Sequence, residues 1–323
     1  MKHWIEAARV RTLPLSVSGI ILGSFYAMSQ SIFNWKIVIA ALSTTLLLQI
    51  LSNFANDYGD GMKGTDNADR IGPKRAIQSG VISPKAMKSA IMITSVLALV
   101  SAVALIYLAF RDTNISYSLF YLILGILAIF SAIRYTVGNT AYGYRGYGDV
   151  FVFVFFGLVS TIGVSFMVLR TVDPLLLLPA AAIGFLSTGV LNLNNMRDEE
   201  SDRKSNKNTI VVKIGGAKAK IYHYFLLTTA MVLMLVFAVY FDYYKDANPN
   251  EFNFDIYIFL LAYIPIIRHL VTVYKNTDPK KLDPELKKLA ISTFLMSVLI
   301  SLSMIYFFTD ILLQVYLYFT QQN

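Results

Sequence analysis

Cysteine is absent from the 323-residue sequence, and charged residues make up only 15% of it. Without cysteine the chain can form no disulfide, no thiolate nucleophile and no cysteine-based metal site. The three histidines, His3, His223 and His269, lack metal-ligand spacing, and each is interpreted as a surface or interfacial side chain. Because 56% of the residues are hydrophobic, the chain is too apolar for an ordinary soluble domain. The composition therefore indicates a membrane protein.

Long apolar runs recur along the whole sequence. A helix needs about 20 such residues to cross the hydrocarbon core, and lipid offers the backbone no hydrogen-bond partners, so these runs must be helical. Barrel strands would instead alternate polar and apolar residues. The sequence predicts one all-α transmembrane domain over residues 1–323, with about nine spans. These are expected at residues 12–30, 36–58, 88–110, 117–135, 148–170, 174–194, 221–241, 255–274 and 288–317.

The basic residues are distributed unevenly between the two predicted faces. If the N-terminus lies inside, all Lys and Arg except Lys36, Arg111, Arg170 and Lys245 lie on the inner face. This asymmetry predicts a cytoplasmic N-terminus, cytoplasmic active-site loops and an outer C-terminus. The net charge of +8 is attributed to anionic membrane lipid and an anionic substrate. No nucleic-acid partner is expected.

Two polar clusters interrupt the apolar pattern, in residues 51–80 and residues 191–209. Each contains amides, then carboxylates, then basic residues. The sequence separation is the same from Asn53 to Asn194 as from Asp57 to Asp198. Four predicted helices lie between the matching points. An even number of crossings returns the chain to the same face. The sequence therefore predicts two parallel pseudo-repeats whose acidic ends meet across a central cavity.

Within each cluster the polar residues share one helix face. Asn53, Asp57 and Asp60 are spaced i, i+4 and i+7, which places them on one side of a helix. The second cluster repeats the stripe with Asn194, Asp198 and Asp202. Carboxylates at the end of an apolar helix are costly without cations. Hard oxygen ligands without His or Cys favour Mg²⁺, and the neighbouring Lys and Arg suit a diphosphate.

Charged surface loops are the competing interpretation of these clusters. For the aligned and repeated stripes the surface-loop interpretation is weaker than the functional one. For four further acids, each taken singly, a surface-loop role is at least as good an explanation as a functional role: Asp66, Asp69, Glu199 and Glu200.

A third stretch, residues 133–157, lies between the predicted fourth and fifth spans. It contains glycines at 138, 143, 146 and 148 and tyrosines at 135, 142, 144 and 147. The glycines permit a tight loop. The tyrosines are consistent with an aromatic ligand site and equally with an interfacial aromatic belt.

With these motifs the sequence resembles the UbiA superfamily of intramembrane aromatic prenyltransferases. Three segments match in order: SNFANDYGDGMKGTDNADRIGPKRAIQSG, YTVGNTAYGYRGYGD and NNMRDEESDRKSNKNT. The family's first aspartate motif is usually N-x-x-x-D-x-x-x-D, in which the two acids are four positions apart. Here Asp60 lies only three positions after Asp57. The N-D-Y-G-D form is similar to the branch that prenylates 1,4-dihydroxy-2-naphthoate.

The resemblance implies transfer of a polyprenyl group from polyprenyl diphosphate to 1,4-dihydroxy-2-naphthoate, with loss of carbon dioxide, in menaquinone biosynthesis. It also implies a bacterial cytoplasmic (inner) membrane location and Mg²⁺ as cofactor. The implied catalytic and metal-binding acids are Asp57, Asp60, Asp198 and Asp202, helped by Asn53 and Asn194. The candidate diphosphate ligands are Lys63, Arg70, Lys74, Arg75, Arg203 and Lys207. The candidate aromatic-substrate residues are Tyr135, Asn139, Tyr144, Arg145 and Asp149, with Arg134 or Arg145 pairing the acceptor carboxylate.

Other functions stay open at this point. A related enzyme using 4-hydroxybenzoate, a homogentisate or a porphyrin would need much the same metal site. An ion-coupled transporter would also have repeats, although its coupling residues usually lie near the bilayer midplane. A metal-dependent phosphotransferase is suggested by Asp57, Asp60 and Gly61 but would need acids on the following helix, where the sequence has none.

Overall fold

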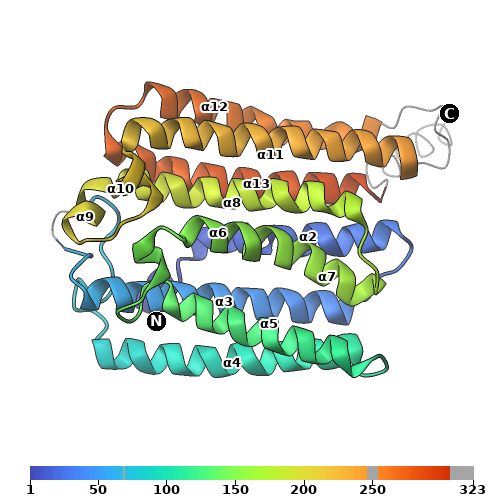
Figure 1. The fold of residues 1–323 in the computed structure, drawn as a ribbon, viewed down its shortest axis with the longest axis horizontal. Helices are drawn as coiled ribbons and strands as arrows, with labels where there is room; N and C mark the ends of the chain where they lie inside the picture. The colour runs from blue at the N-terminus through green and yellow to red at the C-terminus, as the bar shows by residue number, and fades with distance from the viewer. Residues whose placement is uncertain (68–69, 246–253, 306–323) are drawn as a thin grey trace, which may run out of the picture.

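The structure is a computed structural model that describes residues 1–67, 70–245 and 254–305. Its long helices lie side by side in one bundle (Figure 1). In chain order the elements are α1 (Lys2–Ala8), η1 (Val10–Thr12), α2 (Leu13–Ser29), α3 (Trp35–Met62), α4 (Pro84–Phe110), α5 (Ile115–Arg134), η2 (Tyr142–Arg145), α6 (Gly148–Val152), the π-helical η3 (Phe153–Val159), α7 (Ser160–Leu169), η4 (Pro174–Leu176), α8 (Leu177–Arg197), α9 (Glu199–Lys204), α10 (Ile210–Ile214), α11 (Gly216–Lys245), η5 (Phe254–Ala262), α12 (Tyr263–Lys275), η6 (Pro279–Leu282) and α13 (Asp283–Ser303).

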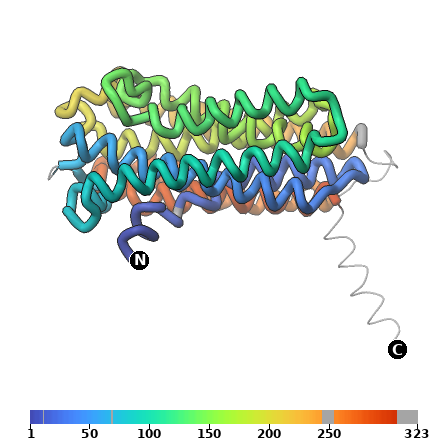
Figure 2. Tube along the Cα trace, turned by 90° about the horizontal axis from the view of Figure 1, so that it is seen from below, coloured from blue at the N-terminus to red at the C-terminus, as the bar shows by residue number. Residues whose placement is uncertain are grey.

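The predicted all-α membrane fold is confirmed. Over the described ranges, eight helical segments are long and apolar enough to cross a membrane, and the bent pair α1 and α2 gives a ninth if counted as one span. That pair bends by 54°, and Figure 2 shows α1 outside the packed bundle. The last predicted span, 288–317, corresponds to α13, and its part beyond residue 305 lies outside the described residues.

The helix boundaries follow from local chemistry. The side chains of Asn34, Ser83 and Asn114 accept backbone N–H bonds from the first turns of α3, α4 and α5, which caps those helices. Pro84 occupies the first position of α4, where its missing N–H costs nothing. These caps fix where each span enters the apolar region.

Helix packing confirms the two parallel pseudo-repeats. Helices α3 and α8 run in the same direction and carry their polar clusters at the same end of the bundle (Figure 1). Helix α3 packs against α4, and α8 packs against α11, while α2 contacts α3, α7 and α13. A Cβ atom on Gly157 of η3 would lie 2.6 Å from the Cα of Gly184 on α8. Glycine therefore permits this close helix contact.

The predicted surface or interfacial positions of His223 and His269 are wrong. Both side chains are fully buried, and their Nε2 atoms lie 2.9 Å apart. His269 Nδ1 lies 2.7 Å from Glu285, which also receives the ammonium group of Lys288 at 2.5 Å. The rings supply each other's polar contacts and link α11, α12 and α13. Spacing alone could not reveal this, because the two histidines are 46 positions apart. His3 is exposed, as predicted.

Candidate active site

A cavity of about 370 Å³ runs through the bundle from the ends of α3 and α8 that carry the polar clusters toward the opposite end. Most of its wall is apolar and comes from α2, α3, α5, α7 and α8. Its polar end is lined by Asn53, Asn56, Asp60, Arg70, Arg75, Asn194, Asn195, Asp198 and Lys207. The two polar clusters therefore meet at one end of an apolar chamber.

Lys207 joins the two clusters. Its ammonium group lies 3.2 Å from Oδ2 of Asp60 and 3.7 Å from Oδ1 of Asp202. Burial would lower the pKa of Lys207, but these two carboxylates hold it above its usual value. Asp60 also accepts a hydrogen bond of 2.7 Å from the hydroxyl of Tyr144, which lies 2.6 Å from the hydroxyl of Thr65.

Asp198 is held by its neighbour Arg197, a residue that sequence reasoning missed. Arg197 donates to both oxygens of Asp198, at 2.9 and 2.6 Å, and to Asn194 at 2.9 Å and Asp283 at 2.5 Å. Burial would raise the pKa of Asp198, but the Arg197 guanidinium holds it below its usual value. The missed signal was an arginine next to a motif acid at the end of an apolar helix.

Asp202 differs from Asp198, because among the described residues no arginine pairs with it. Its side chain is 3% exposed, and burial, together with the charges of Asp198 and Asp60, raises its pKa to about 7. One oxygen, Oδ2, is buried without a hydrogen-bond partner among the described residues.

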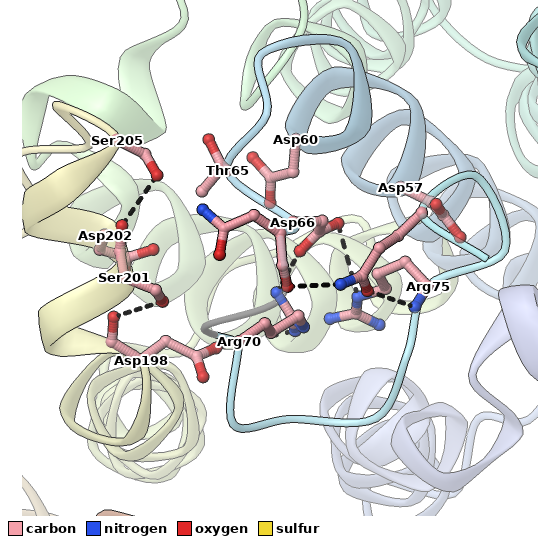
Figure 3. Close-up of polar contacts among 12 residues, drawn as sticks. Asp57, Asp60, Thr65, Asp66, Arg70, Arg75, Asp198, Ser201, Asp202 and Ser205 are labelled. Carbon is pink, nitrogen blue, oxygen red and sulfur yellow. Dashed lines mark hydrogen bonds and ion pairs between the residues drawn. The ribbon is translucent and has the colours of Figure 1, made fainter.

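The loop after α3 folds over the polar end of the cavity and places Asp66 there (Figure 3). Asp66 is 6% exposed and pairs with Arg70, while Nε of Arg75 lies 4.0 Å from its Oδ2. Arg70 also reaches across to Asp198, at 3.7 Å. Burial raises the pKa of Asp66 against the opposing effect of Arg70. Burial and the neighbouring guanidiniums of Arg9 and Arg70 lower the pKa of Arg75.

Asp57 and Asn53 make contacts outside this group. Asp57 accepts the backbone N–H groups of Ala76 and Ile77, at 3.1 and 3.2 Å, and so orders the loop. Figure 3 shows it on the opposite side of the group from Asp198 and Asp202. Asn53 donates a 2.8 Å bond to the carbonyl of Ala8 and ties α1 to α3. Of these two predicted ligands, the cavity wall includes Asn53 but not Asp57.

The predicted basic ligands divide into buried and exposed groups. Arg70, Arg75 and Lys207 line the cavity, whereas three others are exposed: Lys63, Lys74 and Arg203. Lys63 lies 3.8 Å from the ring centre of Tyr144, and Arg203 pairs with Glu199 at 2.8 Å.

Arg9 is a further cavity residue that sequence reasoning missed. It has a φ of 53° between α1 and α2, a strained backbone conformation for a residue with a side chain. Its Nε is buried and has no hydrogen-bond partner within the described ranges. The break between helices α1 and α2 that turns the Arg9 side chain inward has no clear sequence signal.

The predicted aromatic-substrate residues also divide into residues that line the cavity and residues that do not. Tyr135 lines the cavity beside Tyr142, whose ring stacks on Phe151 with centres 4.0 Å apart. Tyr144 is instead engaged with Asp60. The remaining three do not line the cavity: Asn139 and Arg145 are exposed, and Asp149 is buried and accepts a 3.1 Å bond from Tyr222. Arg134 bonds Thr140.

The donor set suits a hard cation. Within residues 1–67, 70–245 and 254–305, no group of three or more His, Cys, Asp or Glu side chains is arranged to hold a metal ion. Two buried carboxylate oxygens, Asp66 Oδ2 and Asp202 Oδ2, have no hydrogen-bond partner in that part of the chain. Asp60 and Asp198 lie at the same polar end of the cavity. The site therefore supplies the carboxylate oxygens that Mg²⁺ prefers, although they are not already gathered around one point.

Sequence comparison identifies the family. The model of the UbiA prenyltransferase family matches residues 16–281. The chain belongs to the UbiA prenyltransferase family. It is 40% identical over 308 residues to a 1,4-dihydroxy-2-naphthoate octaprenyltransferase of Haemophilus influenzae, covering 94% of this chain and 96% of that protein. It is 42% identical over 285 residues to the Escherichia coli protein of the same name, covering 88% and 89%.

Solved UbiA structures share the fold. The apo structure of a UbiA homolog from Aeropyrum pernix K1 superimposes with a TM-score of 0.65 at 15% identity, over 90% of this chain and 98% of that one. A UbiA homolog from Archaeoglobus fulgidus, bound to DMAPP and Mg²⁺, gives 0.58 at 15% identity, over 93% and 99%. The all-helical architecture is therefore that of UbiA proteins.

Proposed function

We propose that this UbiA protein transfers a polyprenyl group from polyprenyl diphosphate to 1,4-dihydroxy-2-naphthoate, with loss of carbon dioxide, to give demethylmenaquinol, the reduced form of demethylmenaquinone. The observation that carries the proposal is the meeting of two acidic motifs, bridged by Lys207, at the end of an apolar cavity. The names of the bacterial relatives support this acceptor.

The diphosphate is proposed to bind at the polar end. Asp60, Asp198 and Asp202 would hold Mg²⁺, and the buried position of Asp66 adds it to this set. Bound Mg²⁺ would neutralise the charge that develops on the leaving diphosphate. Arg70, Arg75 and Lys207 line the same end and would donate to phosphate oxygens.

Three other roles follow from contacts in the folded chain. Asp57 would act mainly by ordering the loop that carries Arg70 and Arg75, through its bonds to Ala76 and Ile77. Asn53 and Asn194 line the cavity and remain proposed auxiliary ligands. Lys63, Lys74 and Arg203 are exposed, so they would attract the anionic donor from outside the cavity.

The acceptor ring is proposed to lie against Tyr135, Tyr142 and Phe151, which form an aromatic wall. Its carboxylate would face Arg9 or Arg75, since both guanidiniums line the cavity. The ring carbon that bears the carboxylate attacks C1 of the prenyl group as the C1–O bond breaks toward diphosphate. The carboxylate then leaves as carbon dioxide, and the electron pair of that bond restores the aromatic ring.

The apolar part of the cavity is proposed to exclude water from the allylic cation and to bind the prenyl tail. Aromatic faces such as that of Phe155 line it and would stabilise the cation. Residues 1–323 would form one domain in the bacterial inner membrane, with the N-terminus and the acidic loops cytoplasmic and the C-terminus outside.

The test is prenylation of carboxyl-labelled naphthoate by the protein in nanodiscs, with and without Mg²⁺. Asp60→Asn and Asp202→Asn should abolish both prenylated product and carbon dioxide release. Glu200→Gln, on an exposed side chain beside the second motif, should leave both unchanged. Turnover of 4-hydroxybenzoate alone would discard the acceptor and keep prenyl transfer. No turnover of any aromatic acceptor would reject the proposal.

A further inference from the structure

The apolar cavity extends across most of the bundle. Its wall includes Asp60 near the inner end of α3 and Ala41 near the outer end. At 1.5 Å per residue, this stretch of helix corresponds to about 28 Å, close to the thickness of a hydrocarbon core. On α5 the wall runs from Tyr135 to Tyr121, about 21 Å by the same measure. A prenyl tail that starts at the acids would therefore point toward Tyr121.

Tyr121 closes the outer end of this path. It is 7% exposed, and its hydroxyl donates a 3.0 Å bond to the carbonyl of Gly163 on α7. The ring lies 5.1 Å from Phe110 and stacks on Phe166 at 6.2 Å. The bond and the two rings hold Tyr121 across the gap between α5 and α7.

The layer behind Tyr121 is itself fixed. Phe110 is 1% exposed, and the guanidinium of Arg170 lies 4.6 Å from its ring centre. Arg170 also donates to the carbonyls of Ala109 and Met167. These contacts tie α4 to α7 at the outer end, so the wall cannot retreat easily when a longer tail arrives.

We propose that Tyr121 is the end wall of the prenyl site and sets how many isoprene units the cavity buries. The proposal rests on the proposed use of a prenyl diphosphate. Affinity for the donor rises with each isoprene unit buried in the apolar chamber. It stops rising when the tail reaches Tyr121, because any further units are no longer buried in the chamber.

Gly125 offers a test in the opposite direction. It lies one turn inward from Tyr121 on the same wall, and a Cβ there would meet only Ala102 Cβ, at 3.7 Å. That is ordinary van der Waals contact, so the Cβ of a larger side chain fits at position 125. The rest of that side chain would occupy part of the cavity. Gly125→Leu should therefore shorten the accepted tail, whereas Tyr121→Ala should lengthen it.

The experiment measures binding of all-trans prenyl diphosphates of increasing length, from geranyl upward, to the protein in Mg²⁺-containing nanodiscs without acceptor. For the wild type, affinity should rise about tenfold or more per unit and then level off. The levelling point should move by at least one isoprene unit toward longer donors in Tyr121→Ala and toward shorter donors in Gly125→Leu.

Two controls separate the end wall from the aromatic cluster. Tyr117→Ala removes a ring that contacts Phe110 and Phe166 but does not line the cavity, and Tyr121→Phe keeps the ring. Both should level off where the wild type does. Identical profiles in all variants would overturn the inference, even if the naphthoate is prenylated. Shifted profiles without turnover of the naphthoate would uphold it and reject the acceptor. No binding of any prenyl diphosphate would overturn both proposals.

Discussion

Lys207 and Asp60 form an ion pair of 3.2 Å although they are 147 positions apart in the chain. The pair brings the loop between α9 and α10 against the end of α3 at the polar end of the cavity. Because both side chains are buried, each charge depends on the other for compensation. The pair is therefore the contact through which the two repeats act as one site.

Replacing Lys207 with Met should destabilise the protein in the absence of Mg²⁺ by about 3–5 kcal/mol, because Asp60 would be left as a buried carboxylate without its lysine partner. The free energy of unfolding in detergent measures this. Lys218→Met, on an exposed lysine, should change it by less than about 0.5 kcal/mol. Equal stability of the two variants would show that the pair contributes nothing.

The sequence predicts the fold and the opposition of the two acidic motifs well, because apolar runs and repeat spacing are patterns along one chain. It predicts the partners of those acids less well. Asp57 fits the helical stripe, but its carboxylate bonds the loop at Ala76 and Ile77, and only tertiary folding sets that contact. Asp66 enters the site for the same reason, since the loop carries it there.

Arg197→Lys should destabilise the protein by a few kcal/mol, because lysine cannot reproduce the fork of bonds to Asp198, Asn194 and Asp283. The matched control is Arg203→Lys, since that side chain is 57% exposed and its surface pair contributes little. Thermal unfolding of both variants gives the comparison. The prediction fails if the two midpoints shift equally.

Tyr144→Phe should lower kcat about tenfold, because it removes one hydrogen bond to Asp60 and leaves the hydroxyl of Thr65 without this partner. KM for the naphthoate should change little, since the Tyr144 ring lies against Lys63 and not along the aromatic wall. Tyr147→Phe, at a side chain 58% exposed, serves as the control. A rise in KM with unchanged kcat would instead assign Tyr144 to acceptor binding.

The stability of the protein without Mg²⁺ should fall as pH rises from about 4 to about 7. Burial, with Asp198 and Asp60 nearby, raises the pKa of Asp202 to about 7, whereas an unfolded Asp titrates near 4. Over this interval the folded chain keeps a proton that the unfolded chain has lost, so each step upward in pH favours unfolding. The loss attributable to Asp202 is at most about 4 kcal/mol. Unfolding free energies measured with EDTA across this range should show it in the wild type and in Glu200→Gln, and Asp202→Asn should remove most of it. An unchanged slope in Asp202→Asn would mean that other groups carry the titration.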